Sequence, residues 1–301
     1  MSGNKIWITG ATGLLGRELV KEFSTSFEGE TLGTGFSRAK PPVLKLDLLD
    51  PVQVETFIKE HKPRFILHCA AERRPDTSEN NKEATTQLNV CVTRELARLA
   101  KAYGAWLLYI STDYVFDGTT PPYQTGDIPN PTNHYGQSKL AGENAIMDIL
   151  DDYGILRVPI LYGPVENLGE SAVTSIANQL RKNPVPPIEN WATRYPTHVA
   201  DVAFVCRQMV QFKDFEAGFR GIFHWSGNEA FTKYGMACLM APTLGIDPKS
   251  IPKGPDTDTG TTPRPKDCGL DISSIGALGF GSQRDFGASI REILLPFRTV
   301  A

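Results

Sequence analysis

The sequence predicts an α/β protein built on a doubly wound parallel sheet, with a smaller second domain, and three observations support this fold class. Short apolar runs alternate with longer segments of helical periodicity through the first half of the 301-residue chain. The segments between successive apolar runs are long enough to hold the crossover helices that parallel strands need. A glycine-rich turn joins the first apolar run to the first helical segment.

The elements of the first half follow from these runs. We expect strands at residues 5–9, 31–35, 43–47, 64–70, 105–111 and 154–158. We expect helices at residues 14–23, 52–60, 86–103 and 135–150. In the first of these helices Leu15, Leu19 and Phe23 fall on one face, which is the pattern of a helix with one buried side.

The second half is irregular and richer in proline and glycine. Residues 183–187 and 253–265 are expected to be loops by their composition. We therefore divide the chain into a first domain of residues 1–162 and a smaller domain formed mainly by residues 163–301. Some later segments, for instance around residues 222–226, are expected to return to the main sheet.

Composition and charge exclude several classes of protein. The chain is 41% hydrophobic and 22% charged, with a net charge of -3, which does not favour nucleic-acid binding. The five cysteines form no C-x-x-C pair and the five histidines show no ligand spacing, so neither a metal site nor a disulfide framework is indicated. The polar start and the short apolar runs predict neither a signal peptide nor a membrane span. We expect a cytoplasmic protein with reduced thiols.

The glycine turn predicts a dinucleotide-binding loop. Gly10, Gly13 and Gly16 give the spacing G-x-x-G-x-x-G between the first expected strand and helix. Glycine allows a tight turn and a close approach of the backbone to a pyrophosphate, and the helix N-terminus offers free N–H groups. The alternative is an ordinary turn, but the position between strand and helix is the one that the binding mechanism requires.

The residues after the second expected strand indicate whether the cofactor is NAD or NADP. An NAD site usually places an acidic residue there to bind the ribose 2′-hydroxyl, whereas this chain has Phe36, Ser37 and Arg38. Serine and arginine side chains can bind a 2′-phosphate, so we expect NADP(H); the alternative is a solvated basic turn. Asp47 and Leu48, after the third strand, are expected to flank the adenine.

A tyrosine and a lysine four residues apart mark the candidate catalytic site. Tyr135 and Lys139 share one face at the start of a helix, and Lys139 is expected to lower the pKa of the Tyr135 phenol, making it a general acid. Thr112 lies at the carboxyl end of the fifth strand, where doubly wound sheets bind ligands. The smaller domain is then expected on the substrate side of the cofactor.

These motifs, TGATGLLG, STDYVFDG and YGQSK, resemble the extended short-chain dehydrogenase/reductase superfamily, which has a Rossmann-type fold. More narrowly, the chain is similar to the dTDP-4-dehydrorhamnose reductase (RmlD-like) branch. The resemblance implies that Thr112, Tyr135 and Lys139 form the hydride-transfer triad. It also implies that Asn89 supports the lysine.

Longer strings resemble the regulatory beta subunits of methionine adenosyltransferase. They are HCAAERRPD, RVPILYGPVE, PTHVADVA and FHWSGNEAFTKYGMA. The glycine turn, the triad and this resemblance together imply one set of cofactor contacts. The set comprises Gly10, Thr12, Gly13, Leu14, Leu15, Gly16, Phe36, Ser37, Arg38, Asp47, Leu48, Cys69, Ala70, Ala71, Arg73, Tyr135, Lys139 and Leu161.

Two functions follow from the resemblance. The first is an NADP(H)-binding regulatory subunit that associates with a methionine adenosyltransferase catalytic subunit and modulates S-adenosylmethionine synthesis. The alternative is an NADPH-dependent reductase of a 4-keto-6-deoxysugar nucleotide, in which Tyr135 protonates the new hydroxyl. The stretch from Arg264 to Cys268 departs from the reductases' R-P-x-N-S pattern, and the long strings favour the regulatory subunit. A weaker third interpretation is an NADP(H) sensor with another partner.

Overall fold

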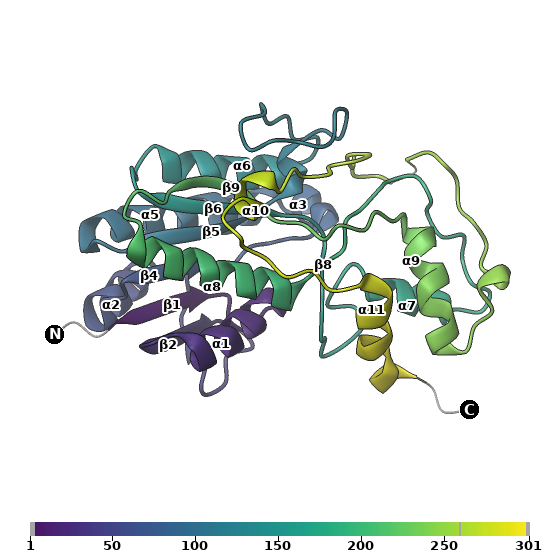
Figure 1. Ribbon diagram of the computed structural model, residues 1–301, viewed down its shortest axis with the longest axis horizontal. Helices are drawn as coiled ribbons and strands as arrows, with labels where there is room; N and C mark the ends of the chain where they lie inside the picture. Colours follow the sequence, from purple (N-terminus) through teal and green to yellow (C-terminus); the bar gives the residue numbers. More distant parts are fainter. Residues whose placement is uncertain (1–3, 259, 299–301) are drawn as a thin grey trace.

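A seven-stranded parallel sheet forms the centre of the computed structural model, which describes residues 4–258 and 260–298 (Figure 1). The strand order is β3-β2-β1-β4-β5-β6-β9, so the chain winds outward from β1 in both directions. The strands are β1 (Lys5–Thr9), β2 (Glu30–Gly35), β3 (Leu44–Lys45), β4 (Phe65–His68), β5 (Trp106–Thr112), β6 (Tyr153–Val158) and β9 (Gly221–His224). The predicted fold class, a doubly wound parallel α/β sheet, is confirmed.

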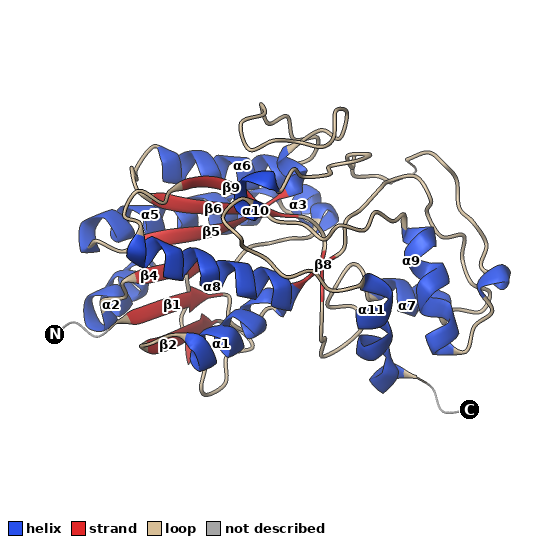
Figure 2. Ribbon diagram, in the orientation of Figure 1, coloured by secondary structure: helices blue, strands red, loops and turns tan. Residues whose placement is uncertain are grey.

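Side chains alternate between the two faces of the sheet, and helices cover both faces (Figure 2). In β1, Ile6 and Ile8 belong to one apolar core, whereas Trp7 belongs to the other. The first core is closed by α1 (Leu14–Ser26), α8 (Val199–Phe215) and α10 (Ser273–Gly276). The second is closed by α2 (Pro51–His61), α5 (Val92–Tyr103) and α6 (His134–Met147).

Local signals explain where these helices begin and end. The Asp50 carboxylate accepts hydrogen bonds from the N–H groups of Val52 and Gln53 and so caps α2. Asn133 caps α6 in the same way by accepting from the N–H of Gly136 at 3.0 Å. At the end of α5, Gly104 takes the left-handed conformation (φ 69°) that terminates helices.

The segment predicted as a helix, residues 86–103, is helical throughout but is not α-helical along all of its length. Two short helices, α3 (Pro75–Asn80) and α4 (Lys82–Thr86), lead into a π-helical turn at Gln87–Cys91, and α5 follows without a break. Asn89 lies in the π-helical turn and bonds to groups outside the helix. The predicted helix is therefore present over its whole length, and its winding is π-helical where Asn89 bonds to the loop after β4 and to α6.

A smaller lobe lies beyond the carboxyl ends of the sheet strands, at the right of Figure 1. Its helices are α7 (Ser175–Leu180), α9 (Lys233–Met240) and α11 (Phe286–Leu294), which share a third apolar core. A two-stranded parallel sheet, β7 (Leu161–Tyr162) with β8 (Thr197–His198), lies between this lobe and the main sheet. Short 3₁₀ turns occur at Asp113–Val115, Ala241–Leu244, Pro248–Ser250 and Leu295–Phe297.

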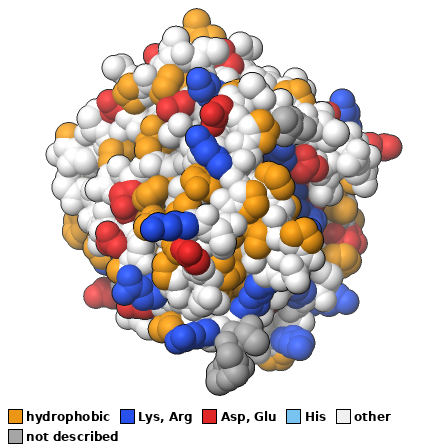
Figure 3. Space-filling view, turned by 90° about the vertical axis from the view of Figure 1, so that its right-hand side faces the viewer, with side chains coloured by type: hydrophobic (Ala, Val, Ile, Leu, Met, Phe, Trp, Pro, Cys, Tyr) orange, Lys and Arg blue, Asp and Glu red, His pale blue; other side chains and the backbone are white. Residues whose placement is uncertain are grey.

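The second half of the chain contributes to both parts of the molecule. Strand β9 pairs with β6, and α8 packs against α1, so these late segments complete the main sheet and one of its faces. The outer end of the smaller lobe carries apolar side chains interspersed with Lys and Arg side chains (Figure 3). Within the part of the chain that the structure describes, no helix is both long and apolar enough to cross a bilayer.

Candidate functional site

A cleft of about 560 Å³ opens at the carboxyl ends of the main-sheet strands, where β1 and β4 lie side by side and the direction of winding reverses. Doubly wound sheets bind their ligands at this topological switch point. Every residue predicted to contact the cofactor lines the cleft, and Thr112 does so too. Asn89 lies behind the cleft wall, with 1% of its surface exposed. The structure thus brings the predicted residues together, while their individual roles stay predictions.

The glycine turn is shaped for close approach of backbone to ligand. Gly10 has φ +66°, and a Cβ atom at Gly16 would lie 2.1 Å from the Gly10 carbonyl oxygen, so larger residues cannot be placed at position 16 without a backbone shift. Helix α1 follows directly, with Gly13 at its N-cap. Because glycine has no side chain to cap the helix, the N–H groups of the first turn are left to bind an anion.

The end of the cleft that carries Arg38 combines a guanidinium group with carboxylates. Arg38 is half-exposed and lies 3.2 Å from Glu166 and 3.5 Å from Glu170. Asp47 lines the cleft nearby, and its carboxylate accepts a hydrogen bond from the N–H of Leu49 at 2.9 Å. The guanidinium of Arg38 can therefore reach an anionic group placed in this corner.

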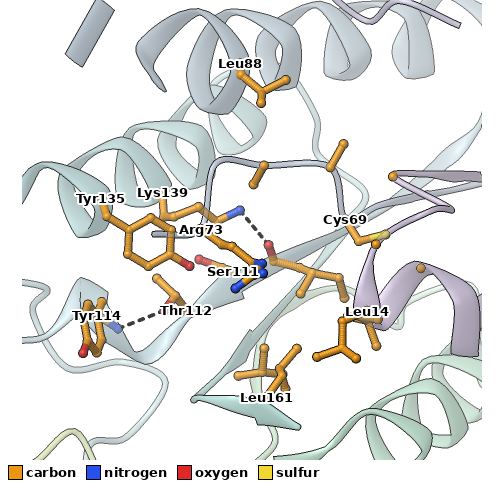
Figure 4. A pocket seen from close by; sticks show the side chains of 18 of the residues that line it. Leu14, Cys69, Arg73, Leu88, Ser111, Thr112, Tyr114, Tyr135, Lys139 and Leu161 are labelled. Atoms are coloured by element: carbon orange, nitrogen blue, oxygen red, sulfur yellow. Dashed lines mark hydrogen bonds between the residues drawn. The ribbon is translucent and has the colours of Figure 1, made fainter. Parts of the chain in front are cut away.

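The triad residues meet at the other end of the cleft (Figure 4). Thr112 ends β5, and Tyr135 and Lys139 project from the first turns of α6. The Tyr135 hydroxyl points toward Thr112, whose own hydroxyl accepts a hydrogen bond from the N–H of Tyr114 at 3.2 Å. The Thr112 and Tyr135 hydroxyls are thus placed to bind one reacting oxygen, as the sequence predicts, while the predicted role of Lys139 is to hold the nicotinamide ribose.

The electrostatics of the triad differ from the prediction. Burial raises the pKa of Tyr135 above its usual value, and the Thr112 hydroxyl partly counteracts this rise. The predicted lowering of the Tyr135 pKa by Lys139 is therefore wrong. The Lys139 ammonium instead donates to the carbonyl oxygen of Ile110 at 2.8 Å and lies 3.9 Å from the ring centroid of Tyr109. Burial lowers the pKa of Lys139 to about 7, and the carboxylate of Glu143 opposes this shift.

Asn89 joins two segments that lie behind the triad. Its amide nitrogen donates to the Ser138 hydroxyl at 3.0 Å and to the backbone carbonyl of Glu72 at 2.9 Å. Its amide oxygen accepts from the N–H of Glu72. Asn89 therefore contacts the residue that precedes Lys139 and fixes α6 against the loop after β4.

A buried ion pair fixes α6 to the sheet. Glu143 lies one helical turn after Lys139, and its carboxylate accepts two hydrogen bonds from Arg157 on β6, at 2.9 and 2.6 Å. The two side chains are 0% and 2% exposed. The Ser111 hydroxyl, next to Thr112, donates to the same carboxylate. This network positions both segments that carry the triad, and the sequence motifs gave no sign of it.

The thiol and the histidine at the end of β4 are structural. Cys69 donates to the carbonyl oxygen of Thr9 at 2.7 Å, and burial raises the pKa of its thiol to about 12. A thiol with so high a pKa is protonated and therefore a poor nucleophile. His68 lies between the hydroxyls of Thr9 (2.8 Å) and Thr93 (3.0 Å), and burial lowers its pKa to about 3.

Two charged residues of the cleft, Arg194 and Asp113, were not among the site residues predicted from the sequence. Arg194 comes from the smaller lobe, is 9% exposed, and pairs with Glu189 at 3.0 Å. It follows an irregular segment, which offers no periodic signal. Asp113 also lines the cleft, and burial raises its pKa to about 7. Its position directly after Thr112 was the available clue. His198 accepts from the N–H of Ala200 at 3.1 Å and caps α8, which is a structural role.

The doubly wound sheet, the glycine turn and the clustered Thr112, Tyr135 and Lys139 define an extended short-chain dehydrogenase/reductase with a Rossmann-type core. The chain belongs to the family of the RmlD substrate binding domain, whose model matches residues 4–299. The predicted resemblance to this branch is confirmed.

Three similar proteins illustrate the range of the family. Methionine adenosyltransferase 2 subunit beta of Xenopus tropicalis is 45% identical over 296 residues, which cover 98% of this chain and 88% of that protein. The dTDP-4-keto-6-deoxy-D-glucose reductase of Streptomyces niveus is 32% identical over 266 residues, covering 86% and 85%. The dTDP-4-dehydrorhamnose reductase of Bacillus anthracis, solved in complex with NADP, superposes with a TM-score of 0.81 at 25% identity, covering 97% and 99%.

Proposed function

We propose that this chain is an NADP(H)-binding regulatory subunit of methionine adenosyltransferase, of the beta type, and that it modulates S-adenosylmethionine synthesis in the cytoplasm. The observation that carries the proposal is the likeness to methionine adenosyltransferase 2 subunit beta, 45% identity that runs through both the sheet and the smaller lobe. The likeness to the Streptomyces reductase is weaker, at 32%. The partner is a methionine adenosyltransferase catalytic subunit.

The cleft residues fit NADP(H). The open first turn of α1 and the close approach allowed at Gly10 suit the pyrophosphate. Ser37 and Arg38 offer a hydroxyl and a guanidinium to the 2′-phosphate, and Lys139 with Tyr135 would hold the nicotinamide ribose. Bound NADPH supplies a hydride donor. We assign cofactor binding to residues 1–162 and the substrate side mainly to residues 163–301.

Two measurements test this proposal. Titration of the purified chain with NADPH and with NADH should show tighter binding of NADPH, because Arg38 favours a 2′-phosphate. Sedimentation of the chain with the methionine adenosyltransferase catalytic subunit of the same organism should show a complex. Failure to associate at micromolar concentrations would contradict the regulatory role.

One observation favours a second function, reduction of a 4-keto-6-deoxysugar nucleotide. Thr112 and Tyr135 lie in the same cleft as Lys139, so a general acid is present beside the expected nicotinamide position. In this role Tyr135 would donate its proton to the carbonyl oxygen of the substrate. The test is to add dTDP- or UDP-4-keto-6-deoxysugars to the NADPH complex and to follow the absorbance of the reduced nicotinamide. Oxidation that Tyr135→Phe abolishes would establish a reductase, whereas stable NADPH supports the regulatory subunit.

A further inference from the structure

Three arginines from separate segments of the main domain contact the segment between β7 and α7. Arg17 comes from α1, Arg38 from the turn after β2, and Arg73 from the loop after β4. All three contact Glu170 or its neighbour Glu166. Arg38, the residue expected to bind the 2′-phosphate, is thus already paired with carboxylates of the chain itself.

Glu170 is firmly fixed. Its side chain is 5% exposed and accepts two hydrogen bonds from Arg17, at 2.6 and 2.8 Å. One of its oxygens also accepts from the N–H of Glu166 at 3.0 Å, and Arg73 donates to its backbone carbonyl. Arg17 in turn donates to the carbonyl oxygen of Thr12 in the glycine turn. Glu170 therefore ties the smaller lobe to the glycine turn and to the loop after β4.

Glu166 is held differently. Its side chain is 60% exposed, and within the described residues its carboxylate contacts Arg38 at 3.2 Å and Arg17 at 3.8 Å. Arg38 is itself 51% exposed, so water screens the pair and its strength is modest. Of the two carboxylates near Arg38, Glu166 is the one that can move away at little cost.

We propose that Glu166 competes with the cofactor's 2′-phosphate for Arg38 and thereby limits how strongly the site prefers NADPH over NADH. This inference rests on the proposed NADP(H) function. The corner around Arg38 carries two guanidinium groups, Arg17 and Arg38, and two carboxylates, Glu166 and Glu170, so its charges balance. When a phosphate enters, Arg38 leaves Glu166 for the phosphate, whereas Glu170 stays on Arg17. Neutralising Glu166 leaves a surplus of one positive charge in this corner and removes the competing acceptor.

The experiment compares wild type with Glu166→Gln by calorimetric titration at low salt. NADPH and the fragment 2′,5′-ADP should bind the variant roughly two- to fivefold more tightly, since an exposed ion pair of this kind has about that effect. NADH and ADP, which lack the 2′-phosphate, should bind unchanged. The gain should shrink as salt is added. Thermal unfolding of the variant should match wild type, because Glu166 is exposed.

Two controls make the result specific. Glu28→Gln removes an exposed carboxylate just before β2 begins, at the end of the strand opposite to the cleft, and should change nothing. In the Arg38→Ala background, Glu166→Gln should give no gain. Unchanged or weaker binding of NADPH and 2′,5′-ADP by Glu166→Gln would overturn this inference. If wild type bound neither NADPH nor NADH, the proposed cofactor function itself would fail.

Discussion

Replacing Glu143 with leucine tests the network that positions the triad. The substitution removes a carboxylate that is 0% exposed and leaves the guanidinium of Arg157 2% exposed. Within the described residues, the remaining side-chain partners of Arg157 are His224, at 3.4 Å, and the ring of Phe116, whose centroid lies 5.1 Å from the guanidinium. A buried charge without its counter-ion destabilises the folded state strongly, and we expect Glu143→Leu to lower the free energy of unfolding by about 3–5 kcal/mol.

A double variant separates the cost of the unpaired charge from the value of the pair. Arg157→Met added to Glu143→Leu removes both charges and leaves apolar side chains of similar size. Such replacements are often nearly neutral, so most of the lost stability should return. The Ser111 hydroxyl loses its acceptor in both variants, a cost of about 1–3 kcal/mol that should remain in the double variant. The expected order of stability is wild type, double variant, single variant.

Urea unfolding followed by tryptophan fluorescence measures these free energies. A single variant within about 1 kcal/mol of wild type would show that water or another group solvates Arg157. A double variant no more stable than the single one would refute the reasoning in a second way, because the loss would then come from packing. NADPH titration of the double variant shows whether the pair also matters for the site.

The remaining predictions concern the glycine turn and acid stability. Gly16→Ala should weaken NADPH binding at least tenfold, since its Cβ would lie 2.1 Å from the Gly10 carbonyl oxygen. The control is Gly126→Ala, where nothing described lies within 4 Å of the new Cβ. This variant should bind NADPH as wild type does in the same titration. The pKa of His68 is about 3 in the folded protein, whereas an exposed histidine titrates near 6.5. Between these pH values the unfolded state binds the extra proton, so acid lowers stability. His68→Asn should therefore lose less stability than wild type on acidification from pH 6.5, by about 1.4 kcal/mol per pH unit. Urea unfolding at several pH values measures this difference. If the free energy of unfolding fell equally with pH in both proteins, the prediction would be contradicted.

Local patterns predicted the central part of the fold and much of the site. Strand β1 and the start of α1 match their predicted positions, because an apolar run followed by a glycine turn is a local signal. The expected cofactor contacts share one cleft because parallel strands bring their carboxyl ends to one edge of the sheet. Strand β3 is shorter than predicted, only Leu44–Lys45, because pairing at a sheet edge depends on one neighbour.

Features set by tertiary contacts could not be predicted in this way. The π-helical turn depends on hydrogen bonds that Asn89 makes to a loop and to α6. Helix α8 packs against both the sheet and its neighbour α1. It therefore lacks the single apolar face that marks a surface helix in the sequence. The raised pKa of Tyr135 follows from burial, which spacing between a tyrosine and a lysine does not reveal.

The rate of S-adenosylmethionine formation tests the central claim most directly. The catalytic subunit of methionine adenosyltransferase from the same organism is assayed alone and with a stoichiometric amount of this chain, with NADPH present. The regulatory function predicts a changed rate or substrate affinity, and no net consumption of NADPH. An unchanged rate together with NADPH oxidation by a 4-keto-6-deoxysugar nucleotide would contradict it and would identify the chain as a reductase.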